Sequence, residues 1–393
     1  MPPDQPHSFS LLLVHKKMIL SFLMIALSLL SAPPLLQAEE TLRVSLMDQV
    51  KQLSFFSRKG FSITTLSGKR LGPLTKSARI SLSPGGIAIN RVDSHLKELL
   101  FIPRRGGMIS LNQNPFQGTF RVIRKKGGLL VLNEVDLELY LKGVVPSEMP
   151  SKWKMEALKV QAVISRTYAL YKKREHRGRE YDLVGSILAQ VYKGASVENR
   201  RTSAAVEMTK GMILSYEGAP ALTFFHSTSA GPTEDASERW NIDLPYLKGV
   251  SCPLDRESPY HQWKKVISLS DLESALRKKG FPVHTVATLT PLKWSRAGRL
   301  LTVRILYNGG EIFLKAEDLR QILGYRILPS TNFRIASFGK ELIFKGMGFG
   351  HGVGLCQWGA KVLAEKGFNF ERILLHYYPG VTLQPYEALQ SSR

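Results

Sequence analysis

The chain has 393 residues, of which 44% are hydrophobic and 22% charged, a globular composition that excludes a disordered chain. Its 54 Lys and Arg outnumber its 32 Asp and Glu, and the net charge of +22 indicates a polyanionic partner, whether nucleic acid, acidic lipid or acidic polysaccharide. The length exceeds one ordinary core and allows two or three packed lobes. The sequence has no zinc-finger spacing, RNP-like strand or basic helix with interleaved aromatics, which argues against nucleic acid as the partner.

The first 38 residues have the pattern of an export signal. Lys16 and Lys17 precede an apolar stretch over 18–30, and the small residue Ala38 follows two prolines. The apolar stretch is too short to span a bilayer comfortably, so we expect cleavage near Ala38 and a protein exported to the periplasm or cell envelope. An uncleaved N-terminal anchor is the alternative.

Residues 39–140 are expected to form a β-rich lobe. Segments such as 42–46 and 120–123 alternate apolar and polar residues, and glycine-rich turn signals separate them. The pattern changes at Pro146, after which residues 151–176 predict one long helix that stops at Gly178.

The rest of the chain mixes helices and strands. A capping box at 270–273 predicts a helix that ends at Gly280, and strands at 300–307 and 311–314 flank a turn. A short helix over 316–323, two strands near Phe333 and Leu342, a glycine-rich loop and two helices split at Gly367 follow. The predicted fold class is α+β: a β-rich N-terminal lobe, a mixed catalytic lobe at 141–385 built around the long helix, and a tail at 386–393.

Glu148 is the first candidate for chemistry. It lies between Pro146 and Pro150, which stiffen the backbone as a catalytic acid requires. The plain alternative is an acidic residue favoured near the N-terminus of the following helix. That position would lower the pKa of Glu148, whereas a general acid needs a raised pKa, for example from an apolar wall of Met149, Trp153 and Tyr168.

Two polar loops are further candidates. Residues 225–235 hold His226, several hydroxyls and two acids, which suits binding of sugar hydroxyl and N-acetyl groups. An ordinary turn whose hydroxyls satisfy the backbone is the alternative. Residues 346–360 contain many glycines, which let backbone approach a ligand closely, but lack the Lys of a phosphate-binding loop.

The two cysteines allow several interpretations. A cysteine-protease pair of His351 and Cys356 is disfavoured because no orienting Asn or Asp is evident. A structural zinc site from His226, Cys252, His261 and His351 is conceivable, although no pair has ligand-like spacing. Whether Cys252 and Cys356 form a disulfide stays open. We therefore expect no cofactor.

These segments resemble the stage II sporulation protein D family, also called the SpoIID/LytB domain. The matching segments are residues 143–150, 156–162 with 165–169, 225–229 with 233–235 and Trp240, 350–354 with 357–360, and 376–380. The chain departs from the family pattern at Ala230, Pro232 and Cys356, where a glycine, a larger residue and a serine are usual.

The resemblance implies an exported lytic transglycosylase that cuts peptidoglycan glycan strands lacking stem peptides, with 1,6-anhydro-N-acetylmuramic acid ends as products. It implies Glu148 as the catalytic acid and base, where ordinary glycosidases use two carboxylates. Expected to orient the sugar are Gln161, Arg166, Tyr168, His226, Ser227, Ser229, Glu234, His351 and Gln357.

Three rival functions remain. The main one is a non-catalytic peptidoglycan-binding protein that recruits or activates a cell-wall amidase. A basic nucleic-acid or lipid binder would show steep salt dependence without glycan selectivity, and a zinc enzyme would lose activity on chelation. The expected partners are glycan strands and an amidase, not nucleic acid. Whether the process is cell division or sporulation is not predicted.

Overall fold

The computed structural model describes residues 40–186 and 189–390. The expected export signal lies outside these residues. In the part of the chain that the structure describes, no helix is both long and apolar enough to cross a membrane. The α+β class is confirmed, since helices and a large sheet are both present.

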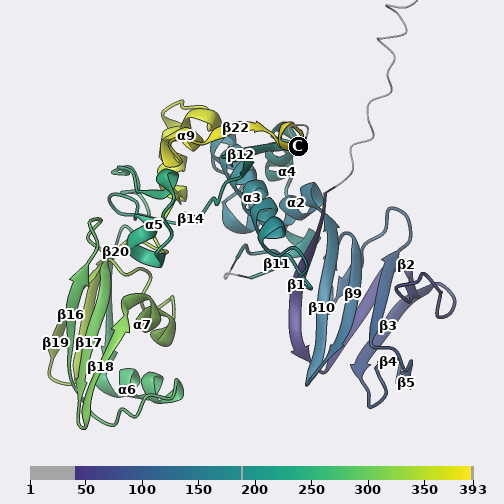
Figure 1. Ribbon diagram of the computed structural model, residues 1–393, viewed down its shortest axis with the longest axis horizontal. Coiled ribbons are helices and arrows are strands. Elements are labelled where there is room, and N and C mark those ends of the chain that lie inside the picture. The colour runs from purple at the N-terminus through teal and green to yellow at the C-terminus, as the bar shows by residue number, and fades with distance from the viewer. Residues whose placement is uncertain (1–39, 187–188, 391–393) are drawn as a thin grey trace, which may run out of the picture. The chain divides into compact units, whose positions relative to one another are not determined.

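The β-rich lobe is one large, mainly antiparallel sheet. Its strands follow the order β11-β1-β10-β9-β6-β2-β3-β4-β5, with β7 paired to β2 and β8 paired to β7. Figure 1 shows this sheet from β1 and β10 to β4 and β5. The strands are β1 (Thr41–Val50), β2 (Gln52–Thr64), β3 (Thr75–Leu82), β4 (Ile87–Ile89), β5 (Val92–Asp93), β6 (Glu98–Pro103), β7 (Ile109–Leu111), β8 (Asn114–Phe116), β9 (Thr119–Lys125), β10 (Gly128–Asp136) and β11 (Leu183–Val184). Alternation places Phe55 in the core and Phe56 at the surface.

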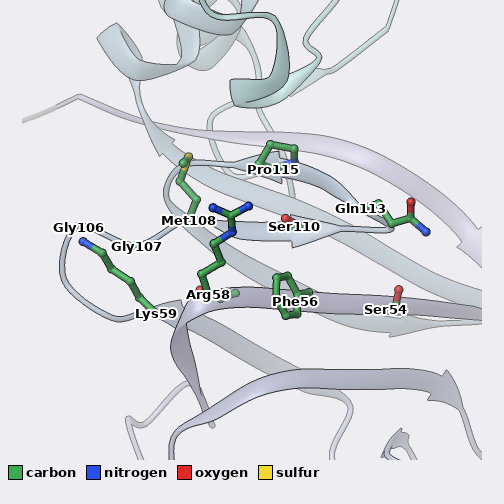
Figure 2. Close-up of a pocket in the computed structure, with 11 residues that line it drawn as sticks. Ser54, Phe56, Arg58, Lys59, Gly106, Gly107, Met108, Ser110, Gln113 and Pro115 are labelled. Carbon is green, nitrogen blue, oxygen red and sulfur yellow. The ribbon is translucent and has the colours of Figure 1, made fainter.

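A cavity of about 620 Å³ lies on this lobe, over β2 and the segments that flank β7 and β8 (Figure 2). The exposed side chains of Phe56 and Met108 line it together with Arg58 and Lys59, and no acidic residue does. The hollow is therefore positively charged. Neither Glu148 nor the residues that contact it, described below, line this hollow.

The helical part of the molecule is built around α3 (Met155–Glu175), in which 13 of 21 residues are buried. Apolar residues of the surrounding elements, except η1 and β13, share one core with the β-rich lobe. The surrounding elements are α2 (Leu137–Glu148), η1 (Gly194–Val197), α4 (Arg200–Met208), β12 (Met212–Tyr216), β13 (Ala219–Pro220), β14 (Phe225–His226), α5 (Ala236–Trp240), η2 (Pro245–Leu247), β21 (Leu355–Cys356), α8 (Gln357–Glu365), α9 (Phe370–Tyr377), β22 (Thr382–Pro385) and α10 (Tyr386–Gln390).

Between η2 and β21 the chain forms a lobe with its own hydrophobic core. Helices α6 and α7 accompany two three-stranded sheets, ordered β16-β17-β18 and β15-β20-β19 (Figure 1). The elements are β15 (Gln262–Ser268), α6 (Leu269–Lys278), β16 (Val286–Trp294), β17 (Leu300–Tyr307), β18 (Gly310–Lys315), α7 (Ala316–Leu323), β19 (Phe333–Phe338) and β20 (Glu341–Met347). The separate core indicates that this lobe is an insertion in the expected catalytic region.

Some expected boundaries shift. The long helix begins at Met155, because residues 151–154 form a turn after Pro150. The capping box belongs to Ser268 and Asp271, so helix α6 starts two residues earlier than the pattern at 270–273 indicated. At the C-terminus the expected tail begins as helix α10, whose Leu389 is buried in the main core.

Candidate active site

Glu148 is the last residue of α2, and the next helix, α3, begins seven residues later at Met155. Pro146 lies inside the last turn of α2, and Met149 leaves the helix in an extended conformation with φ −129° and ψ 138°. The C-terminal end of a helix carries partial negative charge. The α2 dipole therefore favours the protonated form of Glu148, and the expectation that a helix N-terminus lowers its pKa was wrong.

The carboxyl group of Glu148 is half-buried and held by a backbone donor. Its Oε1 accepts a hydrogen bond of 2.8 Å from the N–H of Val191. Burial raises the pKa of Glu148 to about 7, and the Val191 N–H and the charge of Lys193 oppose that rise. Among the described residues, no second carboxylate is one of the groups that shift this pKa. Glu148 can therefore exchange a proton near neutral pH.

The loop that carries Val191 is fixed to two helices. Tyr140 of α2 donates a hydrogen bond of 3.0 Å from its hydroxyl to Oε1 of Gln190. The Nε2 of Gln190 donates in turn to the carbonyl of Ser165 on α3, at 3.2 Å. Because all three groups are buried, the N–H that contacts Glu148 is held in place by the protein core.

Gly143 permits the close approach of this loop to α2. A Cβ atom there would lie 2.7 Å from the ring of Tyr192 and 2.8 Å from the carbonyl oxygen of Gly194. We expect Gly143→Ala to destabilise the fold by about 1–3 kcal/mol, as overpacking does. It should also lower activity by displacing the Val191 N–H. Urea unfolding and a glycan-cleavage assay measure the two effects.

The control for that substitution is Gly178→Ala. Gly178 has φ +83° and a Cβ added there would meet nothing within 4 Å, so alanine introduces backbone strain away from Glu148. We expect it to lower stability and leave activity unchanged. Equal loss of activity in the two variants would contradict a specific role for the contact between Gly143 and the loop.

Gln357 connects the main chain of Glu148 to α3. Its Nε2 donates to the carbonyl oxygen of Glu148 and to Oε1 of Gln161, each at 3.1 Å. Gln357 begins α8 directly after Cys356, which pairs with His226 in the parallel ladder between β14 and β21. The structure thus brings three distant segments of the sequence together at Glu148, and two of the residues expected at the site, Gln161 and Gln357, contact each other.

His226 is buried, and its ring is electrically neutral. Burial and the charge of Arg299 lower the pKa of His226 to about 3. Its Nδ1 donates to the carbonyl of Val353 at 3.2 Å, which makes Nε2 an acceptor. Within residues 40–186 and 189–390, this Nε2 has no hydrogen-bond partner.

His351 belongs to an aromatic group that includes His226. Its ring centroid lies 5.0 Å from that of Trp240, 5.7 Å from that of His226 and 5.9 Å from that of Phe224. Tyr168 extends the group, with its ring 6.3 Å from Phe224. Nδ1 of His351 accepts from the backbone at 3.1 Å, so its proton is on Nε2. Apolar ring faces next to a fixed N–H donor suit the face and hydroxyl groups of a sugar.

Two charged residues expected to orient the sugar form hydrogen bonds and ion pairs within the protein instead. Arg166 is fully buried and makes two hydrogen bonds of 2.7 Å to the carboxylate of Glu138, besides bonds to backbone carbonyls. Glu234 is also fully buried, accepts from the Ser295 hydroxyl at 2.6 Å and lies 3.9 Å from Arg299. Both side chains are bonded within the core.

The serines of the 225–235 loop differ in exposure. Ser227 is half-buried, and its hydroxyl lies 3.2 Å from that of Thr228. Ser229 is 1% exposed and donates its hydroxyl to Asp255 at 3.1 Å. Asp255 was not expected from the sequence, although it accepts hydrogen bonds from two adjacent residues of this loop, Ser229 and Ala230.

The residues considered as zinc ligands do not form one cluster. His226 and His351 belong to the aromatic group above, whereas Cys252 lies with Asp255 and Cys356. His261 contacts that second group through its Nδ1, which is 3.2 Å from Asp255. Both cysteines are free thiols, so the structure has no bond between them.

Sequence reasoning missed two groups that act on the Glu148 carboxyl: the Val191 N–H and the Lys193 charge. Val191 is 43 positions away, and any residue except proline supplies a backbone N–H. No local pattern therefore marks it. Lys193 is one of many lysines, and only the fold distinguishes it.

Comparison with known proteins gives consistent matches. The family model described as stage II sporulation protein matches residues 125–216, and a domain of unknown function matches 253–354. Stage II sporulation protein D of Bacillus amyloliquefaciens is 32% identical over 321 residues, covering 78% of this chain and 90% of that protein. Stage II sporulation protein D of Bacillus subtilis is 32% identical over 273 residues, covering 65% of this chain and 77% of that protein. The amidase enhancer of Bacillus subtilis is 30% identical over 294 residues, covering 63% of this chain and 40% of that protein.

Proposed function

This chain belongs to the stage II sporulation protein D family, and we propose that it is a lytic transglycosylase acting on peptidoglycan glycan strands that lack stem peptides. The observation that supports this most strongly is Glu148, a half-buried carboxyl group whose pKa is raised by burial to about 7. A lytic cleavage needs one group that is first an acid and then a base. A hydrolase of the ordinary kind needs two carboxylates.

In the proposed reaction the protonated carboxyl of Glu148 gives its proton to the glycosidic oxygen as the bond to C1 of N-acetylmuramic acid breaks. The resulting carboxylate then takes the proton from the C6 hydroxyl of the same sugar. The C6 oxygen bonds to C1, which closes the 1,6-anhydro ring. Glu148 regains its proton, and no water is consumed.

The residues expected to orient the sugar would divide into two groups. The first group would contact sugar hydroxyls: His351 through its Nε2–H, and Ser227 through its half-buried hydroxyl. His226, whose Nε2 has no hydrogen-bond partner among the described residues, would belong to the same group. Gln161, Gln357, Arg166, Ser229 and Glu234 would act by holding the backbone of the site, because their polar groups bond within the protein. Tyr168, whose pKa burial raises to about 12, would stay protonated and pack behind the aromatic group.

Charge supports the substrate class. A strand without stem peptides exposes one lactyl carboxylate per disaccharide, and the protein carries a net charge of +22. The hollow lined by Arg58 and Lys59 shows one place where this positive charge has no acidic neighbour (Figure 2). Such a substrate requires that an amidase acts first and that the protein is exported to the cell envelope, both of which are parts of the proposal.

The second candidate is a non-catalytic peptidoglycan-binding protein that recruits or activates a cell-wall amidase. The observation that favours it is the relative named an amidase enhancer. In that case Glu148→Gln would bind strands and stimulate the amidase as the unchanged protein does. Loss of strand cleavage in this variant would support the enzyme.

The pH dependence of cleavage tests the role of the raised pKa. Glu148 must be protonated to act as the acid, so kcat/KM should be level below a pKa of about 7 and fall roughly tenfold per pH unit above it. Lys193→Ala removes a charge that lowers this pKa, and the descending limb should therefore move to higher pH. The exposed Lys293→Ala is the control, in which the limb should stay. A limb near the ordinary pKa of a carboxyl group would contradict the assignment.

A further inference from the structure

Three side chains of the kind that bind transition metals lie close together next to the 225–235 loop. Cys252, Asp255 and Cys356 are each at most 1% exposed. One sulfur or oxygen atom from each lies within 4.8 Å of the other two. Cys252 and Asp255 come from the segment before β15, and Cys356 is the N-cap of α8.

The sulfur atom of Cys356 accepts hydrogen bonds from two backbone amides. The N–H of Gly359 is 3.3 Å away and that of Ser229 is 3.4 Å away. The Cys252 sulfur lies 3.1 Å from the hydroxyl of Tyr377. Without a metal the Cys356 thiol also donates to the carbonyl of Ser227, at 3.6 Å. Metal binding would displace that proton, and the two amide donors would then stabilise the thiolate that binds the metal.

Asp255 is supported in the same way. Its Oδ2 accepts from the N–H of Ala230 at 2.7 Å and from the hydroxyl of Ser229 at 3.1 Å. Its Oδ1 lies 3.2 Å from Nδ1 of His261, which is at the outer side of the cluster with 22% of its side chain exposed. A carboxylate oriented by a backbone amide, a hydroxyl and a histidine has the outer contacts typical of a metal ligand.

The separation of Asp255 and Cys356 matches that of two ligands of a tetrahedral zinc ion, in which the three side chains would fill three of the four positions. Zinc bonds of about 2.3 Å to sulfur and about 2.0 Å to oxygen, at tetrahedral angles, place the two ligand atoms roughly 3.5 Å apart. Oδ2 of Asp255 and Sγ of Cys356 are 3.4 Å apart, a distance at which the metal-free thiol donates a hydrogen bond to the carboxylate. Two thiolates with one carboxylate suit zinc better than calcium or magnesium, which prefer oxygen alone.

We propose that Cys252, Asp255 and Cys356 bind one Zn²⁺ ion, with His261 orienting Asp255. The ion would join the segment before β15 to the N-terminus of α8. Because Gln357 follows Cys356 and bonds to the carbonyl of Glu148, the zinc site would also fix one support of the Glu148 backbone. The proposal does not depend on what reaction the protein performs.

Metal analysis of the purified full chain, expressed with zinc and kept free of chelators, tests the site. We expect about one zinc per chain in the unchanged protein and in the control variant His284→Ala. His284 is exposed and lies between α6 and β16 of the inserted lobe. Cys252→Ser and Cys356→Ser should lose the metal, and His261→Ala should bind it about 10–100-fold more weakly. Serine at 356 can still cap α8, which favours folding of that variant.

Cobalt provides a second readout on the unchanged protein. Stripped of zinc and refilled with Co²⁺, it should show a sulfur-to-cobalt charge-transfer band in the near ultraviolet. Protein that carries no zinc and gives no such band would overturn the proposal, as would zinc that persists in both serine variants. So would a mass lower by two hydrogens, which marks a disulfide between Cys252 and Cys356.

Discussion

Glu148→Gln is expected to lower the rate of glycan-strand cleavage by about 10²–10⁴-fold, the range that general acid–base catalysis contributes. Glutamine keeps the shape of the side chain and can accept the same hydrogen bond from the Val191 N–H. It can neither give a proton to the glycosidic oxygen nor take one from the C6 hydroxyl. The loss should therefore appear in kcat, with little change in strand binding. Single-turnover cleavage of purified strands measures it.

Glu311→Gln is the matched control for that variant. Glu311 lies in the inserted lobe, where it forms an exposed pair with Arg304 at 2.6 Å. Removing its charge should leave cleavage unchanged. If Glu148→Gln cleaved strands as fast as this control does, Glu148 would not be the acid.

Arg166→Ala is expected to destabilise the protein by about 3–5 kcal/mol, the cost of breaking a buried ion pair from one side. Arg166 has no exposed surface, and its two bonds of 2.7 Å to Glu138 join α3 to the start of α2, the helix that ends at Glu148. Without the guanidinium, Glu138 loses two hydrogen bonds, and the carbonyls of Val206 and Met212 lose one each. Urea unfolding monitored by circular dichroism measures the change.

The control variant is Arg304→Ala, which removes an ion pair on the surface. The side chain of Arg304 is 43% exposed and that of its partner Glu311 is 42% exposed. Exposed pairs contribute about 0–1 kcal/mol, so this variant should unfold almost as the unchanged protein does. An Arg166→Ala protein of normal stability that binds strands weakly would instead show that Arg166 contacts the sugar.

The parts of the fold that depend on local patterns were predictable. The turn at 308–310 and the helix from Ala316 to Leu323 follow from residue order alone, and the structure places them as expected. Helix α2 was missed, because Gly143 and Pro146 are poor helix formers. Buried contacts of Tyr140, Leu141 and Val144 override that preference. The separate core of the inserted lobe depends on long-range packing, which no local pattern reports.

The candidate site divides in the same way. Glu148 stands out by its position between two prolines and by the family resemblance, yet its raised pKa comes from burial that the sequence does not show. The sequence placed it before a helix, where the dipole has the opposite sign. Gln161 and Arg166 of α3 were expected to orient the sugar, but both bond within the core. Side-chain burial decides whether such a residue contacts a ligand or supports the backbone.

The most direct test of the proposed activity is the chemistry of the new strand ends. The purified protein is incubated with peptidoglycan from which an amidase has removed the stem peptides, and the products are analysed by mass spectrometry. We predict 1,6-anhydro-N-acetylmuramic acid ends from the unchanged protein and none from Glu148→Gln. Hydrated reducing ends, or tight strand binding without cleavage, would contradict a lytic transglycosylase that uses Glu148 alone.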